Sequence, residues 1–276
     1  MHRFSREDIR ARFDAKLAEK KPIIICETNA GITAKLVSAH GADMLLVTNA
    51  SHFRLRGVDD MVSLRAYGNA NEITKQALTE LRFVVDAIPV VAGIDANDPF
   101  VITDDFVETY KRIGVSGVFN YPTLGISEAP DRAYIDRQGY GFANEIADLK
   151  KRQADGLFTV GGAFYYEDAR LMAEAGVDTV LLNLRYFVEK GTAPELYNDV
   201  DKLCDIIQRR YCELKEINPE CYVVVHGGPF AKLENVRKLL ALTDIDGFVG
   251  SAMFDVDIMR ASITADQQRF ASLRLR

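Results

Sequence analysis

The chain has 276 residues, of which 48% are hydrophobic and 27% charged, a balance that excludes a disordered or collagen-like protein and predicts a sizeable core. Its net charge is −6 at pH 7 and basic residues are mixed with acidic ones, so nucleic acid is not expected as a partner. No window approaches the ~20 apolar residues of a membrane span, and the four cysteines form no C-x-x-C pair, which together predict a cytoplasmic protein that does not bind membranes.

The first predicted element is a helix over residues 5–19. Ser5 precedes it as N-cap, and Asp8, three residues on, completes a pattern like a capping box. This helix would close the bottom of a barrel or lie in an interface. We expect the protein to be a homo-oligomer.

Eight apolar runs of strand length then alternate with amphipathic helical patterns. This alternation predicts a parallel sheet that helices cover on its outer face. The runs are residues 22–26, 43–47, 89–94, 117–119, 158–160, 179–182, 221–225 and 247–249.

Glycine turns recur before every second run, at residues 41–43, 114–116 and 176–178. A glycine after a helix end supplies the left-handed conformation of an αβ turn. This spacing favours an α/β fold in the form of a single closed (βα)8 TIM barrel over a doubly wound open sheet. We expect one domain over residues 1–276, with the N-terminal helix at 1–20, the barrel at 21–262 and a C-terminal tail at 263–276.

Polar residues follow the apolar runs, where the carboxyl ends of barrel strands carry the active site. Two connections, residues 48–70 and 120–141, are also far longer than the usual few residues, and long loops on one rim often carry function. The candidate substrate-binding residues from these connections are Asn49, Ser51, Arg54, Asn120 and Thr123.

Small residues follow the seventh and eighth runs, at the position of the usual barrel phosphate site. Gly227 and Gly228 follow His226, and Gly250 with Ser251 follows the last run. Backbone N–H groups of such residues can approach an anion, so we expect a phosphate or carboxylate to bind there. The alternative is that these glycines only form tight turns.

Four titratable side chains are candidate catalytic residues. His226 ends a strand and could transfer protons or orient substrate. Glu27 and Asp95 could supply proton transfer or together hold one divalent cation such as Mg²⁺. Lys35, where the first strand turns into its helix, could pair with a substrate anion. Glu145, in the first turn of a helix, either faces the site or only contacts the helix dipole.

Other cofactor classes lack a motif in this sequence. Histidine pairs with zinc or non-haem iron spacing do not occur, which disfavours those centres. Neither G-x-G-x-x-G nor G-x-x-x-x-G-K-[ST] occurs, so no nucleotide cofactor is indicated.

The rim motifs resemble those of the phosphoenolpyruvate hydrolase-like family of TIM-barrel enzymes. The resemblance is collinear from about Arg6 to Met259 and implies cleavage of a small anionic oxoacid or phosphorylated substrate, by hydrolysis or by retro-aldol or retro-Claisen chemistry. The motifs that carry it are residues 30–35, 49–54, 66–71, 98–99, 120–125, 173–176 and 226–229.

The sequence departs from the family pattern at several rim positions, among them His52, Asn69 and Asn183. Two functions therefore stay open. In the first, an enzyme binds one anionic end of its substrate at the glycine turns and the other at Arg54 or Lys35. In the second, the barrel binds a small anion without turnover, as a sensor or interaction protein.

Overall fold

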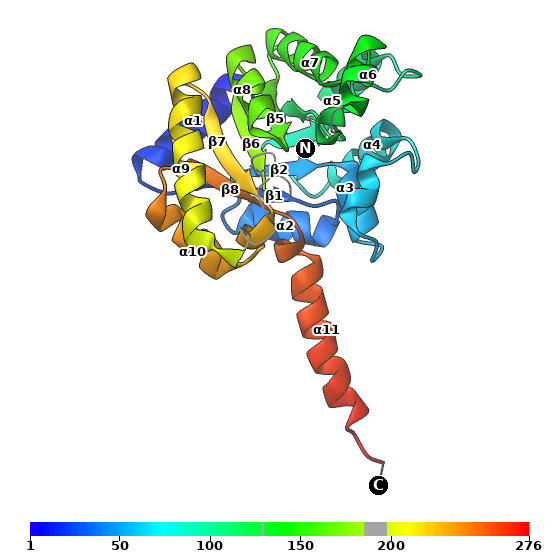
Figure 1. The fold of residues 1–276 in the computed structure, drawn as a ribbon. Helices are drawn as coiled ribbons and strands as arrows, with labels where there is room; N and C mark the ends of the chain where they lie inside the picture. The colour runs from blue at the N-terminus through cyan, green and yellow to red at the C-terminus, as the bar shows by residue number, and fades with distance from the viewer. Residues whose placement is uncertain (128–129, 185–197, 276) are drawn as a thin grey trace.

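The computed structural model describes residues 1–127, 130–184 and 198–275 as a closed barrel (Figure 1). Eight parallel strands pair in sequence order, and β8 pairs with β1 to close the ring. The predicted TIM barrel is therefore confirmed. The strands are β1 (Ile23–Glu27), β2 (Met44–Val47), β3 (Val90–Gly93), β4 (Gly117–Phe119), β5 (Phe158–Ala163), β6 (Thr179–Asn183), β7 (Tyr222–His226) and β8 (Gly247–Gly250).

Helices follow the strands and form the outer layer of the barrel, with several short 3₁₀ turns on the rim. The α-helices are α1 (Arg6–Ala18), α2 (Gly31–Ala39), α3 (Asn49–Arg54), α4 (Ala70–Leu81), α5 (Thr103–Ile113), α6 (Asp131–Arg137), α7 (Phe142–Ala154), α8 (Tyr166–Ala175), α9 (Val200–Ile217), α10 (Leu233–Leu242) and α11 (Val256–Ala271). The 3₁₀ turns are η1 (Asp60–Leu64), η2 (Leu124–Ile126), η4 (Gly228–Ala231) and η5 (Ala252–Phe254).

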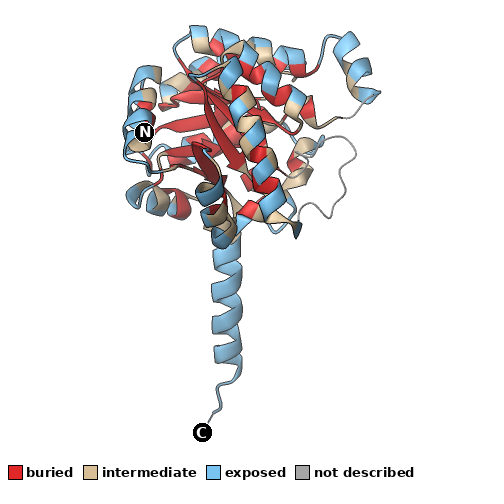
Figure 2. Cartoon of the chain, turned by 60° about the vertical axis from the view of Figure 1, so that its left-hand side comes forward, coloured by how far each residue is buried: buried red, intermediate tan, exposed pale blue. Residues whose placement is uncertain are grey.

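The strands are buried on both faces, as their near-continuous apolar sequences predict. Ile23 and Ile25 point into the barrel, where they join a core with Phe158 and Val224. Side chains that alternate with them point outward and pack beneath the helices. Figure 2 shows this arrangement as a buried barrel inside helices whose outer faces are exposed.

The N-terminal helix α1 forms as the sequence predicts. The Ser5 side chain accepts from the backbone N–H of Asp8, and the Asp8 carboxylate accepts from the Ser5 N–H, which completes a capping box. Phe13 from this helix is buried against Phe158 and Tyr222, so α1 packs against the inner core of the barrel.

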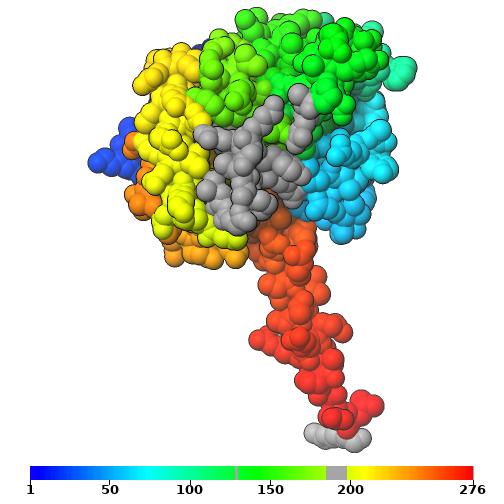
Figure 3. Space-filling view, in the orientation of Figure 1, coloured from blue at the N-terminus to red at the C-terminus, as the bar shows by residue number. Residues whose placement is uncertain are grey.

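The C-terminal helix α11 leaves the barrel and stands off from it (Figures 1 and 3). It runs from Val256 to Ala271 and so passes through residue 263, where a separate tail was expected to begin. None of its residues is buried. Among the described residues, no helix is both long and apolar enough to cross a membrane.

Candidate functional site

A cavity of about 280 Å³ lies at the carboxyl ends of the barrel strands. Its apolar lining includes Leu46, Phe119, Leu181 and Val249, which are side chains of the strands themselves. Polar groups from several loops and strand ends complete the lining: Glu27, Asp60, Tyr121, Asn183, His226, Gly227, Gly228 and Ser251. The strand ends therefore converge on one small chamber with an apolar and a polar side.

His226 ends β7 and lines this cavity, with Asn183 of β6 as its partner in the strand register. Its Nδ1 lies 3.0 Å from the backbone carbonyl oxygen of Val249. A carbonyl oxygen only accepts, so Nδ1 carries a proton and, in the neutral imidazole, Nε2 carries a lone pair. No described residue hydrogen-bonds Nε2, which leaves this nitrogen available to accept a proton.

The turn after His226 brings backbone amides to the cavity. Gly227 and Gly228 adopt φ angles of +79° and +58°, which favour glycine. The N–H groups of Gly228 and Ser251 donate no hydrogen bond to any residue that the structure describes. Gly250 has a different role, because a Cβ there would lie 2.0 Å from the ring of Phe254, and this glycine does not line the cavity.

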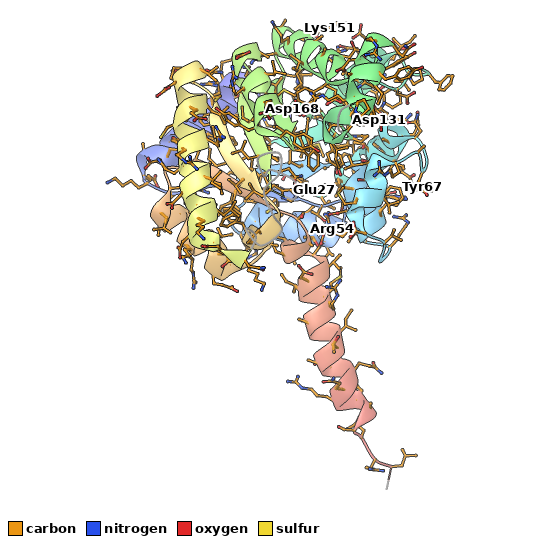
Figure 4. The ribbon with its side chains drawn as sticks, viewed as in Figure 1. Glu27, Arg54, Tyr67, Asp131, Lys151 and Asp168 are labelled. Carbon is orange, nitrogen blue, oxygen red and sulfur yellow. The ribbon has the colours of Figure 1, made fainter. Side chains whose placement is uncertain are left out.

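Arg54 lies beside the cavity and is surrounded by three carboxylates (Figure 4 labels Arg54 and Glu27). Its Nη1 is 3.3 Å from Glu27 Oε2 and 3.4 Å from Asp60 Oδ2, and its Nε is 3.5 Å from Asp255 Oδ1. Nη2 also donates to the Glu27 carbonyl at 3.0 Å. Arg54 does not line the cavity, so its charge neutralises the protein's own carboxylates.

Asn49 and Ser51 hold the loops of the rim together. Asn49 donates from its side chain to the Ser63 carbonyl at 2.9 Å, and the Ser51 hydroxyl accepts from the Asn29 N–H at 2.8 Å. Both side chains are buried and neither lines the cavity. Their placement on the rim agrees with the sequence, but their hydrogen bonds are internal.

The side chains of Asn120 and Thr123 donate hydrogen bonds to Glu145, and neither residue lines the cavity. Glu145 is 1% exposed, and its Oε2 accepts from Asn120 Nδ2 at 2.8 Å and from the Thr123 hydroxyl at 2.6 Å. Its Oε1 accepts from the Leu124 N–H at 2.7 Å and from Asn97 Nδ2 at 3.3 Å. Burial raises the pKa of Glu145 to about 7, although these hydrogen bonds act in the opposite direction.

The structure does not bring Lys35 and Asp95 into the cavity. Lys35 is exposed on α2. The Asp95 carboxylate accepts from the Asn97 N–H at 3.0 Å, and burial raises its pKa.

A divalent cation at Glu27 and Asp95 has no preformed site among the described residues, which contain no cluster of three or more His, Cys, Asp or Glu suited to a metal. The carboxyl group of Glu27 is instead occupied by Thr48 and Arg54. As the structure describes them, Glu27 and Asp95 therefore do not form a metal site.

Several residues of the cavity were not singled out as site residues by their sequence alone. Asp60 and Tyr121 lie within the two long connections, so the length of those loops was the available signal. Asn183 ends the sixth apolar run, and its position as a strand end indicated a place on the rim.

The fold and cavity define a TIM-barrel protein with a chamber at the carboxyl ends of its strands. The chain belongs to the phosphoenolpyruvate hydrolase-like family, whose model matches residues 8–273. It is 28% identical over 261 residues to the ToMV susceptible protein tm-1(GCR26) of Solanum lycopersicum, and the match covers 94% of this chain. The chain spans only 35% of that relative's length.

Solved structures of low sequence identity share the fold. Phosphonopyruvate hydrolase in complex with oxalate and Mg²⁺ is 17% identical with a TM-score of 0.59, over 95% of this chain and 86% of that one. Oxaloacetate acetylhydrolase in complex with 3,3-difluorooxalacetate is 13% identical with a TM-score of 0.61, over 99% of this chain and 88% of that one.

Proposed function

We propose that this protein is an enzyme that cleaves a small oxoacid or its phosphorylated analogue. The observation that carries the proposal is the cavity in which His226 lies beside the unbonded amides of Gly228 and Ser251. The similar structures support it, because phosphonopyruvate hydrolase and oxaloacetate acetylhydrolase are named for activity on small oxoacids. A cavity of about 280 Å³ suits a substrate of that size.

The substrate's anionic end binds at the glycine turn, where the amides of Gly228 and Ser251 donate to it. Another part of the cavity lining carries the carboxylates of Glu27 and Asp60, which Arg54 already pairs with and whose oxygens accept hydrogen bonds. We therefore infer that a hydroxyl or a water molecule occupies that part as a hydrogen-bond donor. This arrangement replaces the expectation that Arg54 or Lys35 binds a second anionic end.

His226 is the proton-transfer group in this proposal. Its Nε2 removes a proton from the oxygen of a bound water or of a substrate hydroxyl. In hydrolysis this oxygen bonds to the group that is released from the departing carbon, which is the carbonyl carbon of an oxoacid such as oxaloacetate or the phosphorus of a phosphonate. In a retro-aldol reaction it becomes the new carbonyl oxygen. In both reactions the bond to the departing carbon breaks, its electron pair stays on that carbon, and the proton on His226 moves to it.

Turnover of phosphonopyruvate and oxaloacetate, measured with and without Mg²⁺, tests the proposal. His226→Gln should lower kcat on the accepted substrate by ~10²–10⁴, the usual contribution of a general acid–base group. His40→Gln is the matched control, since His40 is exposed at the end of α2 and should leave kcat unchanged. A kcat within a few-fold of the parent in His226→Gln, with lowered stability or affinity, would assign His226 only to bracing the turn.

A second candidate is a barrel that binds an anion without turnover. It is favoured because polar groups of the rim interact with other protein groups. Arg54 is paired with carboxylates, and Asn120 donates a hydrogen bond to Glu145. The curated relative is also named for virus susceptibility and not for a reaction. Phosphate or oxalate binding in calorimetry, without turnover of any panel compound, would support this candidate over the enzyme.

A further inference from the structure

Three aromatic side chains form one wall of the cavity, which we call the aromatic wall: Phe119, Tyr121 and Phe164. Phe119 ends β4, and its ring stacks on that of Tyr121, with the ring centroids 5.6 Å apart. A Cβ at Gly162 of β5 would lie only 2.6 Å from the Phe119 ring, so this ring lies directly against β5. The aromatic wall therefore depends on how the ends of β4 and β5 are held together.

Glu145 holds the segment that carries Tyr121, although it does not itself line the cavity. It lies in the first turn of α7 and is 1% exposed. Its carboxylate accepts from Asn120, directly before Tyr121, and from Thr123, two residues after it. The Leu124 N–H is a further donor to this carboxylate. The chain is therefore fixed to one carboxylate on both sides of Tyr121.

Asn120 extends this connection to β5. Its Oδ1 accepts from the Gly162 N–H at 2.6 Å. A backbone N–H only donates, so the amide oxygen of Asn120 faces Gly162 and the amide nitrogen faces Glu145. Asn97, which follows β3, also donates from Nδ2 to Glu145, at 3.3 Å. Glu145 therefore joins the ends of three consecutive strands, of which β4 and β5 lead into the aromatic wall.

The four partners of Glu145 suit an ionised carboxylate. Asn97, Asn120 and Leu124 donate from nitrogen atoms that cannot accept a hydrogen bond. Of the four, only the Thr123 hydroxyl can accept from a protonated carboxyl group, and it would then turn its own proton away from Glu145. Protonation therefore reverses the hydrogen bond at Thr123 and leaves the other three donors with a weaker acceptor.

Charged groups on neighbouring elements also face this region. Burial raises the pKa of Glu145 to about 7, and the carboxylate of Asp95, which follows β3, acts in the same direction. Arg132 of α6 attracts the ionised form, although its main partner is Asp168 of α8, at 2.6 and 2.8 Å. The carboxyl group of Glu145 therefore changes its charge near neutral pH.

We propose that Glu145 is a positioning residue for the cavity, and that its ionised carboxylate holds the chain around Tyr121 so that a substrate can pack against the aromatic wall. The inference rests on the proposed function, because it gives a role in substrate binding to a residue that touches no substrate. Protonation of Glu145 displaces the aromatic wall and weakens binding. The cavity therefore binds its substrate better when Glu145 is ionised.

Fluorine NMR on the full chain, labelled with 4-fluorophenylalanine, tests the position of the aromatic wall without ligand or turnover. The resonances of Phe119 and Phe164, assigned from Phe119→Leu and Phe164→Leu, should shift from pH 5 to pH 8 with a midpoint near about 7. The shift should be absent in Glu145→Gln. It should remain in His226→Gln, which removes the titratable imidazole of the cavity, and in Glu234→Gln, which changes an exposed glutamate of α10.

Two results of this experiment would overturn the inference. The first is a pair of wall resonances that do not move with pH, or that move equally in Glu145→Gln. The second is loss of the shift in His226→Gln, which would assign it to the imidazole. Carbon-13 NMR of the glutamate carboxyl groups of the parent decides the matter if Glu145→Gln misfolds, because one carboxyl resonance should titrate with the midpoint of the wall resonances. A different midpoint would overturn the inference as well.

The KM of an accepted substrate separates a positioning role from a merely structural one. KM of Glu145→Gln should exceed that of the parent ~10-fold at pH 8, with kcat within about threefold. At pH 5 both side chains are neutral, and the two KM values should agree within about twofold. A ratio of KM values that is equal at both pH values would overturn the inference. A parent that turns over no panel compound would refute the enzyme, while the fluorine NMR still decides the role of Glu145.

Discussion

Replacing Glu145 with glutamine should change how the stability of the barrel depends on pH. This carboxyl group is 1% exposed and receives four hydrogen bonds from Asn97, Asn120, Thr123 and the Leu124 N–H. The glutamine amide nitrogen would face two of these donors, which lowers stability by an amount that does not vary with pH. The pH-dependent part of the difference therefore reports the ionisation of Glu145 itself.

Burial raises the pKa of Glu145 to about 7, whereas an unfolded glutamate titrates near ~4.3. The folded state therefore holds a proton that the unfolded state has already released between these two values. The contribution of Glu145 to the free energy of unfolding is fully present below the pKa that it has in the unfolded state, and it is lost as the pH rises through the folded-state pKa of about 7. From pH 5 to pH 8 the loss amounts to about 3 kcal/mol, at ~1.4 kcal/mol per pH unit over about two units.

Urea unfolding of the parent and of Glu145→Gln at pH 5 and pH 8 measures this difference. We expect the stability advantage of the parent over the variant to shrink by about 3 kcal/mol from the lower to the higher pH. Glu234→Gln is the matched control, because Glu234 is an exposed first-turn glutamate of α10. An advantage that is equal at both pH values would show that the four donors keep Glu145 ionised throughout and would refute the reasoning.

Two further predictions concern the rim. Arg54→Met should lower the free energy of unfolding by about 3–5 kcal/mol, because it leaves the buried carboxylates of Glu27 and Asp255 without a counter-charge, and urea denaturation checks this. Gly228→Val should abolish phosphate binding in calorimetry and lower stability by only ~1–2 kcal/mol, the cost of a left-handed residue, with Gly228→Ala as the control for that cost. Unchanged phosphate affinity in Gly228→Val would place the anion elsewhere.

The barrel could be predicted from the sequence because its signals are local. Each strand is an apolar run, and residues 114 and 176 are glycines in the left-handed conformation just where the turn pattern placed them. Ser5 and Asp8 form the capping box within four residues of each other. Such features depend only on residues that are close together in the sequence, so the packing of distant segments does not change them.

The direction of the rim side chains could not be predicted in the same way. Asn120 follows β4 as the sequence indicates, but its partner Glu145 is 25 residues away on helix α7. Arg54 is neutralised by Asp255, which follows β8 at the far end of the chain. The sequence gives each residue its position on the rim, whereas long-range packing decides whether its polar atoms face the cavity or the protein.

These internal bonds narrow the chemistry that the cavity can perform. Among the described residues that line it, the acidic and basic side chains are Glu27, Asp60 and His226. Glu27 is oriented by Thr48 and Arg54, and the Arg54 guanidinium also contacts Asp60, so both carboxylates are electrostatically compensated. His226 differs because its Nδ1–H is fixed by Val249 while Nε2 has no partner among these residues. This difference is why we propose His226, and not either carboxylate, as the group that transfers a proton in this chamber.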